Sequence, residues 1–185
     1  GITKDNNAFR ELVQLYDWTY EAGWIGGEEG GTRGVFESLG LDEAAMRKGP
    51  FLIDRWDYLE SIGYDEEQIE AIDSRFDTDP FTALQEKDVA AWRDEQRPLL
   101  KQAIAALGRP RYWAPIAADN KQSLVMLILL PQLGNHRSLA RSLRALAYSQ
   151  ATTGQSDQAI ETIRAIRLLA WHISHEPTLL GNLVA

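Results

Sequence analysis

The sequence predicts an all-α protein, and three observations carry that prediction. Apolar residues recur three and four positions apart along most of the chain, which is the spacing of one face of a helix. Helix-start residues, namely Asn, Asp and the pair Asp-Pro, precede several of these segments. No segment shows the alternation of apolar and polar residues that a half-buried strand needs. We therefore expect one compact helical domain over residues 1–185, with about seven to nine helices.

The N-terminal part should contain a first helix, a glycine-rich connection and a second, short helix. Asn residues that can cap a helix precede four apolar residues at helical spacing: Phe9, Leu12, Val13 and Tyr16. Six glycines fall between residues 23 and 34, which indicates a loop or flexible connection. A short helix is expected after Leu41-Asp42.

Two further helix starts are readable in the middle of the chain. Asp65 is followed three residues later by Gln68, which is the spacing of a capping box. Asp79-Pro80 predicts another start, because proline suits the first turn of a helix. Pro98 lies inside the helical pattern that follows, so we expect it to kink that helix or to separate two helices.

The C-terminal part predicts three helices. The first, over residues 124–133, should be buried on most sides and kinked or ended by Pro131. The second covers residues 138–151, and its apolar face is expected to hold Leu139, Leu143, Leu146 and Ala147. The third covers residues 157–175, and its apolar face is expected to hold Ala159, Ile163, Ile166, Ala170 and Ile173.

Composition and charge limit the class of function. Of the 185 residues 44% are hydrophobic and 25% charged, which is ordinary for a globular protein, and there is no cysteine for disulfides or thiolate metal sites. The net charge of −8 argues against binding to nucleic acid, which needs a basic surface. No apolar run approaches the ~18 residues of a membrane span.

The charge is unevenly distributed along the chain. Residues 1–110 hold 23 acidic and 12 basic residues, giving −11, whereas residues 111–185 hold 4 and 7, giving +3. We therefore divide the single domain into an acidic N-terminal subregion, 1–110, and a helical-hairpin subregion, 111–185. Residue 1 is Gly rather than Met, so we expect that an upstream targeting or anchoring segment has been removed. The apolar C-terminal end suggests that the natural chain continues.

The last two predicted helices resemble a tetratricopeptide hairpin. Gly154 stands between them, and the small residues Ala147 and Ala159 stand where the two helices of such a hairpin cross closely. Three positions depart from the pattern: Gln150 replaces an aromatic residue, Ile166 a small one, and Trp171 a terminating proline. We expect a tetratricopeptide-like hairpin rather than a repeat array.

A second resemblance covers residues 93–185. The ordered set Arg137-Ser138-Leu139-Ala140, Leu143, Ala147, Gly154, Ala159 and Pro177-Thr178-Leu179-Leu180 is similar to an uncharacterised helical family of planctomycete-type bacteria. This resemblance implies a bacterial source and a last helix that continues beyond residue 185. It implies no activity and no catalytic residues, and it leaves open whether the protein is cytoplasmic or anchored through a removed N-terminal segment.

Several residue groups could carry chemistry, and each also has a structural explanation. His172 and His175, with Glu176 beside them, could ligate a metal at the end of a helix, but histidine cations also suit a helix C-terminus. The glycine-rich segment lacks a phosphate-loop Lys and contains Glu28 and Glu29, which would repel phosphate. Two groups of carboxylates could act as acid and base, or form a solvated face: Asp54 with Asp57, and Glu66 with Glu67 and Glu70.

Arginine interleaved with aromatic residues forms two stripes at helical spacing. One consists of Arg137, Arg141, Arg144 and Tyr148, and the other of Ile160, Arg164, Arg167 and Trp171. Such stripes are typical of interfaces, because guanidinium groups pair with carboxylates and stack on rings. Either these arginines contact the acidic N-terminal subregion of the same chain, or they receive an acidic partner protein or a second subunit.

The sequence therefore predicts a noncatalytic interaction or scaffold protein, with no cofactor. The alternative is a helical enzyme that binds a metal or a small molecule through carboxylates and His172/His175. The two differ in one feature: an enzyme needs a closed pocket with buried acids, whereas a scaffold needs an exposed apolar or arginine-lined surface.

Overall fold

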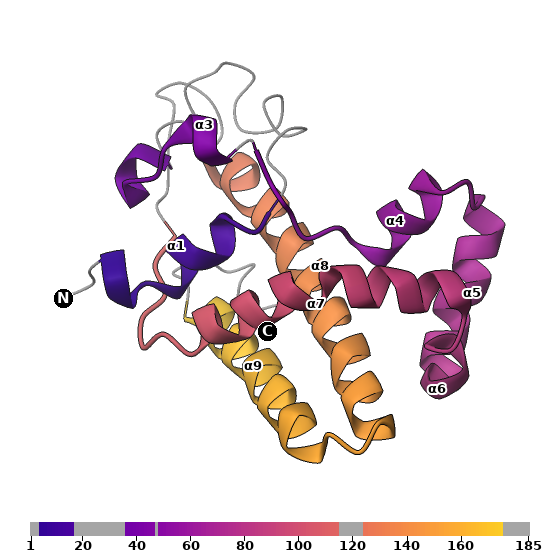
Figure 1. The fold of residues 1–185 in the computed structure, drawn as a ribbon. Helices are drawn as coiled ribbons and strands as arrows, with labels where there is room; N and C mark the ends of the chain where they lie inside the picture. The colour runs from indigo at the N-terminus through magenta and orange to yellow at the C-terminus, as the bar shows by residue number, and fades with distance from the viewer. Residues whose placement is uncertain (1–3, 17–35, 47, 115–123, 176–185) are drawn as a thin grey trace.

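A computed structural model describes residues 4–16, 36–46, 48–114 and 124–175, with the backbone alone for 124–133. These residues form nine helical elements and no strand, so the predicted all-α fold is confirmed (Figure 1). None of the helices in these ranges combines the length and the apolar character needed to cross a bilayer.

The N-terminus is tied to the connector that follows the central helix. A 3-10 turn, η1 (Lys4–Asn6), leads into α1 (Ala8–Val13). Buried Asn7 lies between them, and its side-chain oxygen caps α1 by accepting from the backbone N–H of Phe9 at 3.2 Å, as predicted. The same side chain accepts from the Trp113 N–H at 2.9 Å and donates to the Trp113 carbonyl at 3.0 Å. One asparagine therefore fixes the start of α1 and the connector together.

Four short or medium helices follow: α3 (Glu43–Met46), α4 (Arg55–Ser61), α5 (Glu66–Thr78) and α6 (Pro80–Ala83). The capping box at the start of α5 is present, with Asp65 accepting from the Gln68 N–H at 2.9 Å and Gln68 accepting from the Asp65 N–H at 3.0 Å. Asp79 caps α6 by accepting from the Thr82 N–H at 3.2 Å. The predicted starts in this part of the chain are confirmed.

The two longest helices each run through a proline. The central helix α7 (Lys87–Leu107) contains Pro98, and α8 (Leu124–Thr152) contains Pro131. Of the two alternatives expected at each proline, the separation into two helices at Pro98 and the helix end at Pro131 are excluded, whereas a kink at either proline stays a prediction. In α7 a proline costs ~3 kcal/mol, but Trp92 before it and Leu100 after it are fully buried, and such side chains each contribute ~1.5–3 kcal/mol. Packing on both sides of the proline keeps α7 continuous.

Buried side chains form two hydrophobic clusters. The first cluster joins α1, the second half of α7, α8 and α9, and its central members include Phe9, Leu12, Leu100, Leu107, Leu143 and Leu169. The second cluster joins α4, α5, α6, the first half of α7 and one residue of α8. Its members are Leu59, Ile69, Ile72, Phe76, Ala83, Leu84, Val89, Trp92 and Ala145. Helices α7 and α8 contribute to both clusters.

The extended segment before α4 is held against α7 by both backbone groups of Ile53. The Trp92 indole Nε1–H donates to the Ile53 carbonyl at 2.9 Å, and the buried Gln96 side-chain oxygen accepts from the Ile53 N–H at 3.0 Å. These contacts satisfy both backbone hydrogen-bonding groups of Ile53. They therefore fix the position of α4 and the second cluster relative to α7.

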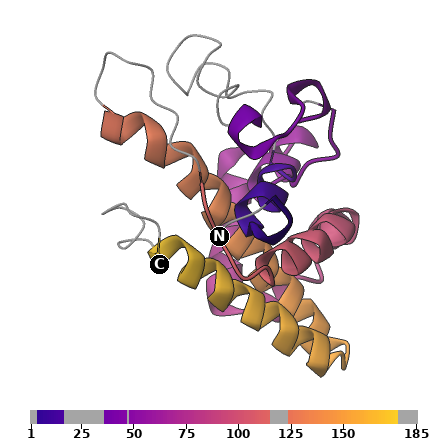
Figure 2. The same ribbon diagram turned by 90° about the vertical axis from the view of Figure 1, so that its left-hand side faces the viewer.

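The predicted C-terminal hairpin is present. Helix α9 (Ser156–Ser174) follows α8 after a three-residue turn in which Gly154 has φ +75°, a conformation that glycine adopts without strain. Figure 2 shows α9 on the outside of the molecule, with α8 behind it. Inside the hairpin the buried Thr162 hydroxyl donates to the Gln150 side-chain oxygen at 2.8 Å, so Gln150, which interrupts the tetratricopeptide pattern, links the two helices.

The apolar face predicted for α8 is confirmed, because Leu139, Leu143, Leu146 and Ala147 are all buried. The face predicted for α9 is partly wrong. Its buried residues are Ala159, Thr162, Ala165, Leu169, His172 and Ile173, whereas Ile163 is exposed and Ile166 and Ala170 are half-buried. Helix α9 is rotated from the expected orientation because two polar residues, Thr162 and His172, find hydrogen-bond partners on the buried side.

Candidate functional site

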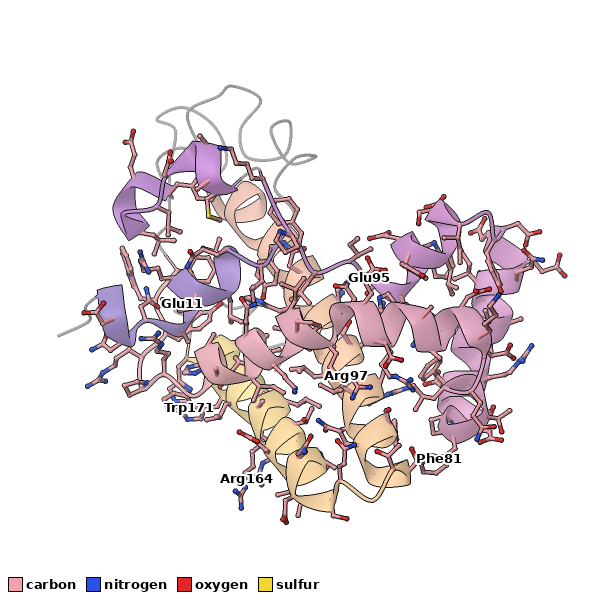
Figure 3. All side chains as sticks on the ribbon, in the orientation of Figure 1. Glu11, Phe81, Glu95, Arg97, Arg164 and Trp171 are labelled. Carbon is pink, nitrogen blue, oxygen red and sulfur yellow. The ribbon has the colours of Figure 1, made fainter. Side chains whose placement is uncertain are left out.

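The structure places the two arginine stripes on different sides of the molecule. The stripe on α8 faces α4, α5 and α6, where Arg144 pairs with Asp77 of α5 at 3.0 Å. The stripe on α9 faces away from α8, as Figure 3 shows for Arg164 and Trp171. The sequence therefore does not encode one arginine surface but two separate ones.

The outer face of α9 is apolar as well as basic. We use this name for Ile160, Ile163, Arg164, Arg167, Leu168 and Trp171, which all project from the side opposite the buried residues. Their apolar side chains are well exposed, at 48% for Ile160, 49% for Ile163, 38% for Leu168 and 50% for Trp171. In the described part of the chain eight large apolar side chains are exposed to this degree, and four of them lie on this face.

The two arginines of this face are free of intramolecular partners within the described residues. Neither Arg164 nor Arg167 makes a hydrogen bond or an ion pair there, and both are exposed. Trp171, at the end of the face, is held by ring contacts with His175 at 4.4 Å and with His172 at 5.2 Å between centroids. The face thus combines unpaired cations with a positioned aromatic ring, the combination that interfaces favour.

On α8, two of the four stripe residues, Arg144 and Tyr148, make contacts inside the molecule. Arg144 also donates to the Phe76 carbonyl at 3.3 Å, and the Tyr148 ring packs edge-on against Phe81 of α6 at 5.7 Å between centroids. Arg137 is exposed. Arg141 is exposed as well and makes no hydrogen bond or ion pair to any described residue.

Arg141 lines a cavity of about 250 Å³ between α8 and the α4–α5 pair. The other lining residues are Arg55, Asp73, Phe76, Asp77 and Arg144, and we call this space the arginine cavity. Arg55 pairs with Asp73, and its guanidinium lies 3.7 Å from the centroid of the Phe76 ring. The cavity therefore has three guanidinium groups and two carboxylates around it. Sequence reasoning missed Arg55, Asp73 and Asp77, because no local pattern distinguishes them from other surface charges.

The two histidines at the end of α9 differ in burial and in hydrogen bonding. The His172 ring is buried and its Nε2–H donates to the Leu107 carbonyl at 3.2 Å. The other ring nitrogen, Nδ1, is then an acceptor, and it is buried without a hydrogen bond to any described residue. Burial lowers the pKa of His172, and nearby His175 lowers it further, although the bond to Leu107 opposes the shift. His175 is exposed, and its Nδ1–H donates to the Trp171 carbonyl at 2.7 Å. Glu176 lies outside the described residues.

The acidic candidates stand mainly on exposed positions. Asp54 caps α4 by accepting from the Trp56 N–H at 2.9 Å, and partial burial, followed by the charges of Asp54 and Glu60, raises the pKa of Asp57. Glu66, Glu67 and Glu70 all face solvent on α5.

Among the described residues no group of three metal-ligating side chains comes together. The glycine-rich segment lies outside the described residues. The alternative function, an enzyme that uses these carboxylates and histidines, therefore stays a prediction.

A buried chain of tyrosine and histidine side chains joins three parts of the molecule. His136 of α8 is fully buried, and its Nδ1 lies 2.9 Å from the Tyr16 hydroxyl and its Nε2 2.6 Å from the Tyr112 hydroxyl. A neutral imidazole carries one donor and one acceptor, so one tyrosine donates to the ring and the other accepts. Burial lowers the pKa of His136 from 6.5 to about 4.

Sequence reasoning missed His136, although its position was readable. It stands three residues before Leu139 and seven before Leu143, on the buried face of α8. Helical spacing therefore predicts its burial. The two tyrosines come from distant segments, and no spacing predicts them.

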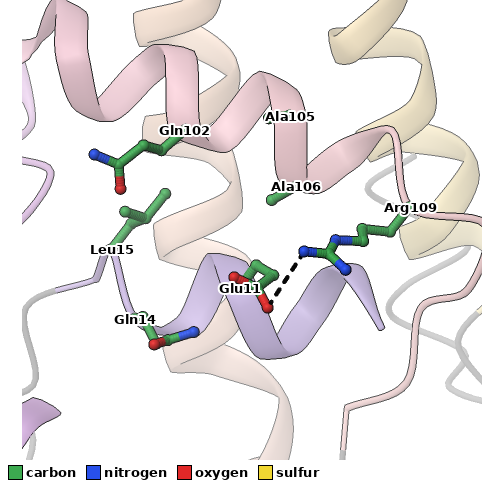
Figure 4. Close-up of a pocket in the computed structure, with 7 residues that line it drawn as sticks. All are labelled: Glu11, Gln14, Leu15, Gln102, Ala105, Ala106 and Arg109. Carbon is green, nitrogen blue, oxygen red and sulfur yellow. Dashed lines mark ion pairs between the residues drawn. The ribbon is translucent and has the colours of Figure 1, made fainter. Parts of the chain in front are cut away.

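A second cavity, of about 260 Å³, lies between α1 and α7 (Figure 4). It is lined by Glu11, Gln14, Leu15, Gln102, Ala105, Ala106 and Arg109. Arg109 and Glu11 form an ion pair across it at 3.6 Å, so the charges in this cavity already balance each other.

Comparison with protein-family models, with curated proteins and with solved structures found no match. The resemblances to a planctomycete-type family and to a tetratricopeptide hairpin therefore stay predictions, and the functional argument depends on the surfaces described above.

Proposed function

We propose that this protein is a noncatalytic interaction protein, and that it binds an acidic, amphipathic segment of a partner protein on the outer face of α9. The observation that carries the proposal is the composition of that face. Four large apolar side chains and two unpaired arginines share one side of a single helix, within the described residues. Exposed apolar residues are common singly, but their concentration in one place indicates an interaction site.

The chemistry of the partner follows from the charges on this face. Arg164 and Arg167 lie side by side along the helix, one turn apart, between Ile160 and Trp171. Guanidinium groups pair bidentately with carboxylates, and burial at an interface strengthens such pairs. An amphipathic segment with apolar anchors and Asp or Glu between them matches both properties. In a two-fold contact through this face, a second copy of this chain would present the same cations and would lack this complementarity.

The test places a photo-crosslinking amino acid at position 163 in the outer face, and in a control protein at the exposed position 101 of α7. Cross-linking in the source cells should give a specific adduct from position 163 only, and peptide mapping should locate it in an acidic, amphipathic segment. Equal adducts from both positions, or a neutral or basic segment, would contradict the proposal. A cross-link between two copies of this chain would replace it with self-association.

Charge reversal of the two arginines should weaken binding strongly while leaving the fold intact. For the double variant Arg164→Glu, Arg167→Glu we expect the dissociation constant of the mapped segment, measured by calorimetry, to rise at least ~100-fold, since each of the two buried charged hydrogen bonds contributes ~1.5–3 kcal/mol. The free energy of unfolding should change by no more than ~0.5 kcal/mol per site, because both side chains are exposed. The double variant Lys87→Glu, Lys101→Glu makes the same change in net charge at two exposed positions of α7 and is the matched control. Equal losses in the two proteins would show only an effect of net charge.

A further inference from the structure

The residues that line the arginine cavity carry an excess of positive charge, and no other described residue pairs with it. Two of its three guanidinium groups each have a carboxylate partner, in the pairs Arg55–Asp73 and Arg144–Asp77. Arg141, the third, makes no hydrogen bond or ion pair to any described residue. The six residues that line the cavity therefore carry a net charge of +1.

Arg55 is held in place but has an unused donor. Its side chain is 11% exposed, it stacks on the Phe76 ring, and it pairs with Asp73. Its Nε–H is buried and makes no hydrogen bond within the described part of the chain. A buried donor without a partner costs ~1–3 kcal/mol, so a ligand oxygen that reached this group on a small movement of the cavity wall would be favoured.

We propose that the arginine cavity binds a carboxylate group that carries a single negative charge. A monoanion would neutralise the excess charge, whereas a dianion such as HPO₄²⁻ would leave a net negative charge and would be repelled twice as strongly by the carboxylates of Asp73 and Asp77. The planar carboxylate matches the fork of the Arg141 guanidinium. The volume of about 250 Å³ leaves room for a short stem beside the carboxylate.

This site is separate from the surface assigned to the protein partner, because the cavity lies between α8 and the α4–α5 pair, whereas the partner surface lies on the outside of α9. The carboxylate could belong to a small metabolite or to a polypeptide end. Both sources would use the same guanidinium contacts, and they are separated by the experiment below.

The experiment is a titration of the ¹⁵N-labelled protein with sodium propionate at pH 7 and constant ionic strength, followed through the Nε–H signals of the arginines. We expect saturable shifts of the Arg55 and Arg141 signals, and no such shifts with propionamide or with an equal concentration of chloride. In Arg141→Gln the dissociation constant should rise at least ~10-fold, as expected for loss of one charged hydrogen bond. Arg97→Gln, which removes an arginine of α7 outside the cavity, should leave it unchanged.

A parallel titration uses N-acetyl-trialanine with its C-terminus free or amidated. Tighter binding of the free-acid peptide than of propionate indicates a polypeptide end, and equal or weaker binding indicates a small carboxylate. The proposal is overturned if the shifts do not saturate, if propionamide or chloride reproduces them, if phosphate binds as well as propionate, or if Arg141→Gln binds like the wild type. None of these outcomes depends on α9, so a failure here leaves the proposed function standing.

Discussion

Lowering the pH from 7 to 4 should destabilise the protein by about 3 kcal/mol through His136 alone. This imidazole has a pKa of about 4 in the folded protein, because burial disfavours its charged form, and 6.5 in the unfolded chain. Between these two values the unfolded chain binds more protons than the folded protein, so acid favours unfolding. The contribution to stability is complete above pH 6.5 and is lost progressively down to pH 4, and each pKa unit corresponds to ~1.4 kcal/mol.

Urea unfolding monitored by circular dichroism at several pH values between 4 and 7 measures this effect. In His136→Gln the side chain can still donate and accept hydrogen bonds but does not titrate, so its stability should fall less steeply between pH 6.5 and 4. Part of the slope will remain, because burial also lowers the pKa of His172. His175→Gln, which changes an exposed imidazole, is the control. The same pH dependence in wild type and His136→Gln would contradict the assignment.

Trp92→Ala should destabilise the protein by ~3–5 kcal/mol, the cost of removing a large aromatic side chain from a core. Trp92 is only 1% exposed and lies in the second cluster, and its indole N–H holds the Ile53 carbonyl at 2.9 Å. Trp92→Phe keeps most of the ring volume but leaves that carbonyl without its donor. We expect this variant to lose ~1–3 kcal/mol, the cost of an unsatisfied buried polar group.

The matched control for this truncation is Trp113→Ala, because Trp113 is 43% exposed and its backbone, not its ring, makes the hydrogen bonds to Asn7. Trp113→Ala should cost much less than Trp92→Ala in the same urea unfolding experiment. If the two substitutions cost the same, the second cluster does not carry the stability that its burial indicates.

Local structure was predictable where the deciding contacts are local. The capping box of Asp65 and Gln68 and the Asn7 cap each join groups two or three residues apart, so the sequence alone contains both partners. The effect of the prolines was not predictable from the sequence for the opposite reason. Whether Pro98 breaks α7 depends on what Trp92 and Leu100 pack against, and those contacts come from other helices.

The orientation of α9 at the candidate site was not predictable for the same reason, because the contacts that decide it come from other helices. Its most apolar side by sequence includes Ile163, yet Thr162 and His172 are buried because Gln150 of α8 and the Leu107 carbonyl of α7 receive them. The stripe of Arg164, Arg167 and Trp171 was nevertheless readable from spacing. The arginine cavity was not, because Arg55 and Arg141 meet only through the packing of α8 on the N-terminal helices.

The sharing of α7 and α8 by both hydrophobic clusters has a consequence for cooperativity. Neither cluster can unfold without removing side chains that the other packs against. Helix α7 supplies Leu100 to the first cluster and Trp92 to the second, and α8 supplies Leu146 to the first and Ala145 to the second. In native-state hydrogen exchange, the most protected amides of these two helices should therefore share one opening free energy, equal to that of global unfolding. The acidic and the basic halves of the chain would then melt as a single thermodynamic unit.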